Sequence, residues 1–146
     1  MARFSGRGGR ENRMLNQAAK PDSDMYRILI VSDDPFLRDM VRFALDGLGA
    51  EIRTPGDRSE ALRLARRVLF DLVLVLAACP YADCEAMLPR RQRGMRRPRI
   101  FFVAWQHSEH AVLSVLDGGV DQYMTFPVNL QRLRLKVAEC LNTLNP

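Results

Sequence analysis

This sequence of 146 residues lacks any apolar run long enough to cross a membrane. The longest run, 72–79, falls far short of the roughly 20 residues that a membrane-spanning helix needs. The N-terminus has no apolar stretch of the kind found in signal peptides. Because 47% of the residues are hydrophobic, the chain has enough apolar material for the core of one domain. We therefore expect a cytoplasmic protein that does not contact the membrane.

Cysteine is scarce, with only three residues, Cys79, Cys84 and Cys140. An odd number without a compact spacing pattern argues against a disulfide framework. Cys79 and Cys84 have no histidine or third cysteine nearby in the sequence, so they do not form a zinc-binding motif. We expect buried structural thiols, and neither a metal site nor a cofactor.

The usual sequence signs of catalysis are also missing. The chain shows no Ser-His-Asp set, no glycine-rich loop for a phosphate group and no pair of catalytic carboxylates. We therefore expect a protein that acts by binding a partner and not as an enzyme.

Positive charge is concentrated in two places, although the whole chain carries a formal net charge of +5. The first 24 residues are rich in Arg and Gly and are expected to form a flexible basic tail, followed by one domain over 25–146. The second basic segment contains six arginines and no acidic residue, namely Arg90, Arg91, Arg93, Arg96, Arg97 and Arg99. A solvated loop, an acidic protein partner, a cyclic dinucleotide or other phosphorylated ligand, and nucleic acid all remain open as explanations. The segment lacks an aromatic side chain for base stacking, which weakens the case for single-stranded nucleic acid.

Strand and helix patterns alternate along the rest of the chain. Apolar runs predict strands at 26–32, 51–54, 72–77, 100–104 and 121–125. Amphipathic spacing predicts helices at 37–48, from a cap at Asp57 or Ser59 to Leu69, at 81–88, at 108–116 and at 130–141. Such alternation predicts an α/β fold with a parallel sheet covered by helices on both faces. Ligands of these folds bind at the carboxyl ends of the strands, so the residues that follow each strand are the candidates for function.

Those residues lie within a recognisable set of motifs. The strings RILIVSDDPFLR, DLVLVLAACP, PRIFFVA and GGVDQYMTFP occur in this order between about Tyr26 and Leu144. With these motifs the chain resembles the receiver domain of bacterial two-component response regulators. The resemblance implies the flavodoxin-like, doubly wound (βα)5 fold, with five parallel strands in the order 2-1-3-4-5.

The resemblance also identifies five positions that an active receiver uses for phosphoryl transfer. Two acidic residues after the first strand help to hold Mg²⁺, and an aspartate at the end of the third strand accepts the phosphoryl group. A Thr or Ser after the fourth strand and a Lys after the fifth strand bind the phosphoryl oxygens. In this chain the corresponding residues are Ser32, Asp33, Leu76, Val103 and Phe126, so only one acidic residue remains.

These replacements imply a pseudo-receiver that neither takes a phosphoryl group nor needs Mg²⁺. We expect Leu76, Val103 and Phe126 to converge at the carboxyl end of the sheet and to pack over the position of the usual acidic pocket. Asp33 then becomes an ordinary surface carboxylate or the cap of the first helix. Asp71 precedes its strand and Asp83 lies beyond the motif, so neither is expected to replace the missing aspartate.

The resemblance suggests surfaces for protein contacts as well. Tyr123 occupies the position of an aromatic residue that rotates on activation in the family, and here we expect a packing role. Receivers commonly pair through their fourth helix, fifth strand and fifth helix, which points to a homodimer through His110, Leu113, Tyr123 and Arg132. Trp105 is a candidate interface anchor. The expected function is thus phosphorylation-independent binding to a sensor kinase or another signalling protein.

Overall fold

The computed structural model describes residues 25–77, 97–104 and 109–144. Its strands are β1 (Tyr26–Val31), β2 (Ala50–Arg53), β3 (Leu72–Ala77), β4 (Arg99–Ala104) and β5 (Gln122–Thr125). Its helices are α2 (Pro35–Ala44), α3 (Arg58–Arg67), α4 (Glu109–Asp117) and α5 (Leu130–Thr143). The predicted tail at 1–24 and the predicted helix at 81–88 lie outside the described residues.

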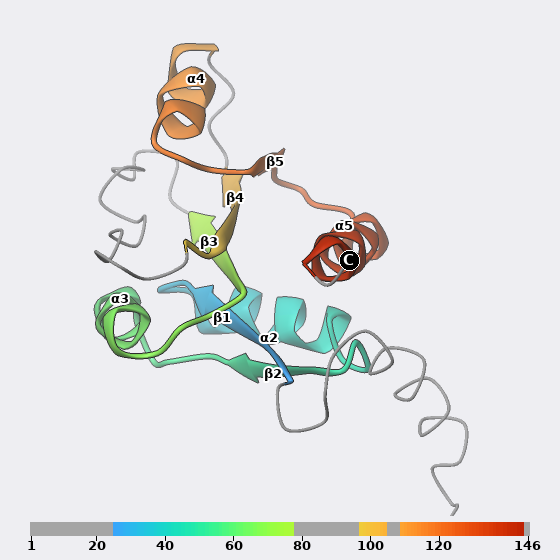
Figure 1. The fold of residues 1–146 in the computed structure, drawn as a ribbon. Coiled ribbons are helices and arrows are strands. Elements are labelled where there is room, and N and C mark those ends of the chain that lie inside the picture. Colours follow the sequence, from blue (N-terminus) through green and yellow to red (C-terminus); the bar gives the residue numbers. More distant parts are fainter. Residues whose placement is uncertain (1–24, 78–96, 105–108, 145–146) are drawn as a thin grey trace, which may run out of the picture.

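The five strands form one parallel sheet in the order β2-β1-β3-β4-β5 (Figure 1). This arrangement confirms the fold predicted from the sequence. Strand β3 lies near the centre, and all six of its residues are buried. A continuous apolar sequence suits this position, because a central parallel strand is covered by helices on both faces.

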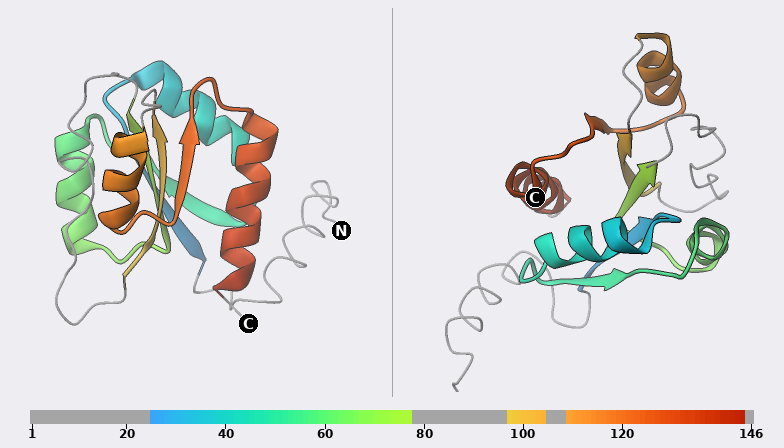
Figure 2. Two further views of the ribbon diagram at one scale, coloured as in Figure 1. Left: turned by 90° about the horizontal axis from the view of Figure 1, so that it is seen from above. Right: turned by 180° about the vertical axis from the view of Figure 1, so that it is seen from behind.

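Alternate residues of the strands build two separate core layers. Leu72, Leu74 and Leu76 belong to a cluster that also contains buried residues of α2 and α5. Val73, Val75 and Ala77 belong to the second cluster, with buried residues of α3 and α4. Figures 1 and 2 show α2 and α5 on one face of the sheet and α3 and α4 on the other. The period of two in a strand therefore determines which helix each side chain contacts.

The helix boundaries follow from local capping groups. Helix α2 starts with Pro35 directly after Asp34, whose side chain accepts hydrogen bonds from the first-turn backbone. It ends at Ala44, earlier than the predicted 48, and two glycines with positive φ angles follow, Gly47 and Gly49. Asp57, and not Ser59, caps α3.

Among the described cysteines, Cys140 is only half-buried, which corrects the prediction of a buried thiol. Burial nevertheless raises the pKa of the Cys140 thiol, and nearby Asp121 and Asp71 raise it further while Arg99 lowers it. Cys79 and Cys84 lie outside the described residues. Within the described segments, no helix has the length and apolar character needed to cross a membrane.

Candidate functional site at the carboxyl ends of the strands

The candidate site lies at the carboxyl edge of the sheet, which comprises the last residues of the parallel strands and those that follow them. Leu76 and Val103 are the penultimate residues of β3 and β4, and they are partners across the two strands. Ser32 directly follows β1, and Phe126 directly follows β5. Parallel pairing thus brings the positions predicted from the resemblance to one edge of the sheet.

Three of these positions are occupied by buried apolar side chains. The exposed fraction is 2% for Leu76, 0% for Val103 and 6% for Phe126. All three belong to one hydrophobic cluster, together with Leu37 of α2 and Leu133 of α5. The peptide bond between Phe126 and Pro127 is cis. The edge is therefore closed by hydrocarbon at these three positions.

Ser32 and Asp34 form a local hydrogen-bonded turn. The backbone N–H of Asp34 donates to Ser32 Oγ at 3.0 Å, and the buried Ser32 hydroxyl donates to the Asp34 carbonyl at 3.4 Å. The Asp34 carboxylate accepts hydrogen bonds from the N–H groups of Phe36 and Leu37. Asp34 is therefore the cap of α2, so of the two alternatives predicted for Asp33 the helix cap is wrong and the surface carboxylate is confirmed. The reason is that the cap is the residue directly before the first helical residue. The first helical residue of α2 is Pro35, so the cap is Asp34 and not Asp33.

Asp33, the single remaining acidic residue of the family's five positions, is an exposed carboxylate held by α3. Its side chain is 60% exposed. Its Oδ1 accepts a hydrogen bond from the backbone N–H of Arg58 at 2.9 Å, and its Oδ2 lies 3.9 Å from Arg58 Nε. Arg38 of α2 donates to the carbonyl groups of Pro55 and Gly56. Asp33 and Arg38 thus tie the β1–α2 region to the loop before α3.

The opposite edge of the sheet carries the buried carboxylate. Asp71 directly precedes β3, and its Oδ2 accepts a hydrogen bond from the backbone N–H of Arg27 at 2.8 Å. The backbone of Asp71 also bonds to Arg27 and Arg99, so this residue joins the amino ends of β1, β3 and β4. Asp71 is thus at the wrong end of the strand to replace the missing aspartate. Asp83, the other carboxylate considered, lies outside the described residues.

Asp121 has a similar position at the amino end of β5. Its Oδ2 accepts a hydrogen bond from the backbone N–H of Ile100 at 2.8 Å and forms an ion pair with Arg97 at 3.4 Å. Gly119 has a φ angle of +103°, and a Cβ placed there would lie 3.2 Å from the Arg97 guanidinium. Arg97 is therefore packed against the turn before β5.

The described part of the arginine-rich segment belongs to this amino edge. The Arg97 side chain is 31% exposed and paired, whereas Arg99, the first residue of β4, is exposed. Both lie at the opposite end of the strands from Leu76. The other four arginines, Arg90, Arg91, Arg93 and Arg96, lie outside the described residues, so their predicted role in binding stays a prediction.

The positions predicted for protein contacts lie on three elements. Tyr123 of β5 is half-buried and stacks on Phe102 of β4, with ring centroids 6.0 Å apart. His110 and Leu113 of α4 are exposed, as is Arg132 of α5. Trp105 lies outside the described residues. The homodimer through this face stays a prediction.

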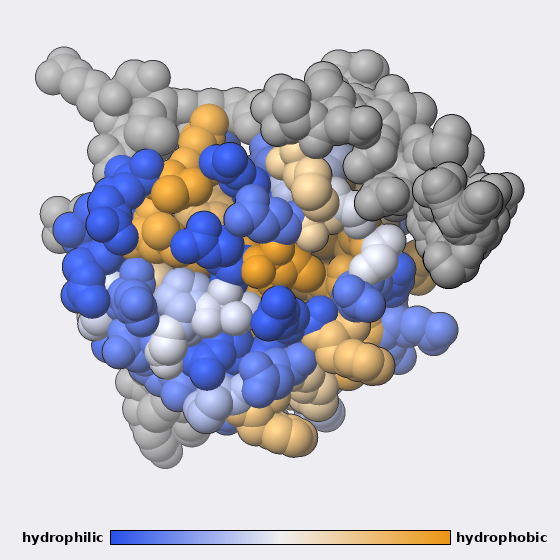
Figure 3. All heavy atoms as spheres, turned by 90° about the horizontal axis from the view of Figure 1, so that it is seen from below, coloured by the Kyte–Doolittle hydropathy of each residue, from blue (hydrophilic) through white to orange (hydrophobic). Residues whose placement is uncertain are grey.

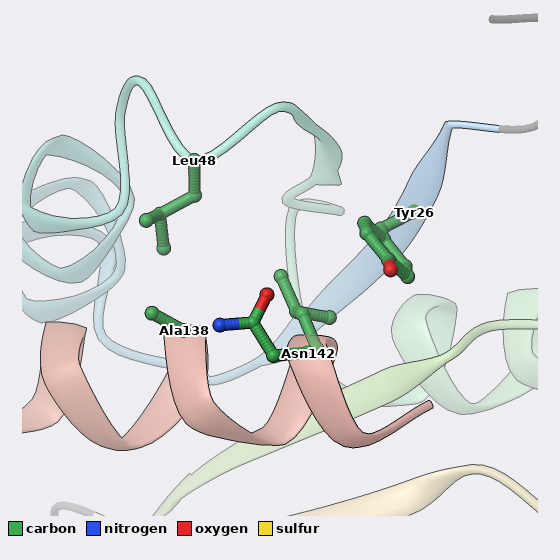
Figure 4. A pocket seen from close by; sticks show the side chains of 5 residues that line it. Tyr26, Leu48, Ala138 and Asn142 are labelled. Carbon is green, nitrogen blue, oxygen red and sulfur yellow. The ribbon is translucent and has the colours of Figure 1, made fainter. Parts of the chain in front are cut away.

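A small open pocket is found on the side of the molecule where β1 begins. Tyr26, Leu48, Ala138, Leu141 and Asn142 line it (Figure 4). Tyr26 is the first residue of β1, and three of the others come from the second half of α5. None of the five has an acidic or basic side chain, so the pocket offers neither a nucleophilic carboxylate nor a charged group for a phosphate.

Sequence reasoning missed several groups that shape the carboxyl edge. Arg58 lies 25 positions from Asp33, and nothing in the local pattern indicates that the two are neighbours. The anchoring of Pro55 and Gly56 by Arg38 is likewise a long-range contact. The cap at Asp34, by contrast, could have been found, because an Asp directly before a Pro at the start of an amphipathic pattern is a helix-start signal.

Comparison with known proteins places this fold and edge in context. No protein-family model matches the chain. It is 34% identical over 118 residues to an uncharacterized 14.6 kDa protein from the sodA1 3′ region of Leptolyngbya boryana, an alignment that covers 78% of this chain and 89% of that protein. It is 32% identical over 120 residues to the DNA-binding response regulator MtrA of Mycolicibacterium smegmatis, covering 80% of this chain and 50% of the regulator.

The chain is also similar to solved structures of receiver domains. A CheY-like receiver domain protein from Methanospirillum hungatei JF-1 is 26% identical, with a TM-score of 0.67 and coverage of 82% of this chain and 96% of that one. The chemotaxis response regulator CheY4 of Vibrio cholerae is 23% identical, with a TM-score of 0.68 and coverage of 80% and 99%. The chain therefore belongs to the receiver-domain family of two-component response regulators. Within that family it has the CheY-like arrangement of strands and helices, and it spans about half the length of the transcriptional regulators that it matches.

Proposed function

We propose that this chain is a pseudo-receiver, which acts by binding a protein partner without being phosphorylated. The observation that carries the proposal is the burial of Leu76, with 2% exposure, at the position where the family has its phosphoacceptor aspartate. A leucine side chain has no atom that can attack phosphorus, and this one is packed within the core. A phosphoryl group therefore has no acceptor at this position.

The surrounding positions support the same conclusion. Val103 lacks the hydroxyl group and Phe126 lacks the ammonium group that bind phosphoryl oxygens in the family. Both side chains are buried in the same cluster as Leu76. All three positions differ from the family pattern, and the side chains that occupy them pack together in one cluster.

The residues at this edge do not fit the Mg²⁺ ion that active receivers use. Mg²⁺ prefers hard oxygen ligands in octahedral geometry. Of the three protein positions that would surround it, Leu76 has no side-chain oxygen, and the Ser32 hydroxyl is engaged with Asp34. Asp33 is engaged with Arg58. Among the described residues, no three His, Cys, Asp or Glu side chains gather in a way that would hold a metal ion.

The partner that we propose is a sensor kinase or another signalling protein, because the chain belongs to a family of signalling domains. Curated relatives include the DNA-binding response regulator MtrA and the probable transcriptional regulatory protein TcrX of Mycobacterium tuberculosis. A ligand sensor built on the arginine-rich segment is less well supported. Of its described members, Arg97 is already paired with Asp121, and both Arg97 and Arg99 lie at the amino edge of the sheet.

The proposal can be tested by incubating the full chain with Mg²⁺ and acetyl phosphate and measuring its intact mass. A phosphorylatable CheY-type receiver treated in parallel serves as the positive control. We expect the control to gain a phosphoryl group and this chain to keep its mass. Stoichiometric phosphorylation of any Asp in this chain would overturn the proposal, and peptide mapping would identify the residue.

A further inference from the structure

Helix α2 carries two exposed phenylalanine side chains. Phe36 is 74% exposed and Phe43 is 81% exposed, although large apolar side chains are usually buried. They are seven residues apart, which corresponds to about two helical turns and places them on one face of the helix, about 10 Å apart. The core face of α2 is formed by other residues, including Leu37 and Val41. The two phenylalanines therefore do not contribute to the core of a single chain, and packing within the chain does not explain them.

Figure 3 shows the molecule from below relative to Figure 1, where separate apolar surfaces interrupt a largely hydrophilic one. Apolar groups rimmed by charged side chains are typical of protein interaction sites.

Three charged residues lie between the phenylalanines along the helix, and one of them, Arg38, is engaged with the carbonyl groups of Pro55 and Gly56. Asp39 and Arg42 are both exposed, and neither forms an ion pair with another residue in the described part of the chain. They are three positions apart and therefore lie on the same flank of the helix. Their charges are opposite, so this flank can complement a copy of itself.

We propose that α2 is a homodimer interface, in which two copies of the chain pair their α2 helices antiparallel about a two-fold axis. The axis passes opposite the midpoint between Phe36 and Phe43. In this arrangement Phe36 of one copy packs against the partner's Phe43, and the reverse contact occurs at the other end. A two-fold axis keeps the charged flank of both helices on the same side. Asp39 then comes level with the partner's Arg42 to within about 3 Å along the helix axis.

Charge complementarity favours a second copy over an unrelated protein. With the axis opposite the midpoint of the two phenylalanines, Asp39 and Arg42 fall on opposite sides of it, so each comes close to the opposite charge of the partner copy. The interface is on the other side of the molecule from α4, where Leu113 is 51% exposed (Figure 1). It is thus distinct from the α4–β5–α5 pairing expected from the family resemblance. It is also independent of whether the chain can be phosphorylated.

The test begins with sedimentation equilibrium of the full chain over a concentration series. We expect a monomer–dimer equilibrium whose dissociation constant rises at least about tenfold in either Phe36→Ala or Phe43→Ala, because each phenylalanine is buried in the dimer. Leu113→Ala is the matched control and should leave the constant unchanged. Circular dichroism should show that all three variants keep the fold, since the altered side chains are exposed in the monomer.

A charge-reversal experiment tests the antiparallel pairing itself. Asp39→Lys and Arg42→Glu should each weaken the homodimer, because one places positive charges opposite each other and the other places negative charges opposite each other. Mixing the two single variants should give a heterodimer, and the double variant should dimerise like the original chain. A chain that stays monomeric at all concentrations would overturn the proposal, even if another protein binds α2. So would a dimer that is disrupted by Leu113→Ala but not by the phenylalanine variants, or charge variants that are not rescued by mixing.

Discussion

The two edges of the sheet differ in the side chains that they bury. At the amino edge, Asp71 is buried and accepts a backbone hydrogen bond, and Asp121 accepts one from the amino end of β4. At the carboxyl edge, where the family has its acidic site, Leu76, Val103 and Phe126 are buried as hydrocarbon. A buried carboxylate is tolerated where backbone N–H groups point at it, and it is costly elsewhere. The comparison teaches that the acidic groups at the amino edge serve structure, while Leu76, Val103 and Phe126 at the carboxyl edge belong to the core.

The largest loss of stability is expected when a carboxylate is placed among the buried side chains of the carboxyl edge. Leu76→Asp removes a core side chain and leaves a charge without a described donor, so the free energy of unfolding should fall by at least about 4 kcal/mol. Urea denaturation followed by circular dichroism measures this change, and partial unfolding in buffer would also agree with it. Leu76→Met, which nearly conserves volume, should cost less than about 1.5 kcal/mol. If Leu76→Asp were as stable as Leu76→Met, the edge would have to be a hydrated pocket.

The next largest loss of stability is expected when the buried carboxylate is removed from the amino edge. Asp71→Ala leaves the backbone N–H of Arg27 without its acceptor, and we expect a loss of about 1.5–3 kcal/mol in unfolding free energy. Asp71→Asn keeps an oxygen acceptor and should lose less. Asp117→Ala, at the exposed end of α4, is a control for the loss of an acidic residue and should change the stability little. Equal stability of the Ala and Asn variants would argue that this hydrogen bond has no role.

A smaller difference separates the two neighbouring acids at the carboxyl edge. Asp34→Ala removes the cap of α2 and should cost about 1 kcal/mol of unfolding free energy. Asp33→Ala removes an exposed ion pair with Arg58 and a hydrogen bond from the Arg58 backbone N–H, and it should cost less than that, because water screens the ion pair and can replace the exposed acceptor. Thermal melts of both variants under identical conditions give the comparison. A larger loss for Asp33→Ala would show that its link to α3 supports the fold.

The smallest effect is a shift in chemical reactivity near the amino edge. Because burial raises the pKa of the Cys140 thiol, its thiolate fraction at mildly alkaline pH is below that of an exposed cysteine. In a variant that carries Cys79→Ser and Cys84→Ser, alkylation by iodoacetamide should therefore begin at a higher pH in the folded protein than in urea. Coincident pH profiles for the folded and unfolded states would contradict this expectation.

Sequence reasoning predicted the fold because its strongest signals were local and regular. The run LVLVLA gave the buried central strand, and the alternation of apolar runs with amphipathic patterns gave the parallel sheet. The motifs around Leu76, Val103 and Phe126 also placed these residues at one edge, since the carboxyl ends of parallel strands coincide. What the sequence could not supply was the set of contacts between distant elements, such as Asp33 with Arg58 and Arg97 with Asp121. The choice between Asp33 and Asp34 as cap was decided by the position of Pro35.

The central claim, that the carboxyl edge is closed to phosphoryl chemistry, is tested most directly by NMR. Amide spectra of the ¹⁵N-labelled chain would be recorded during titration with Mg²⁺ and then beryllofluoride, which mimics a phosphoryl group. The account predicts no saturable shifts at Asp33, Leu76, Val103 or Phe126. Saturable shifts at these four residues would mean that the edge still binds the metal and the phosphoryl mimic, and the chain would then be a switchable receiver.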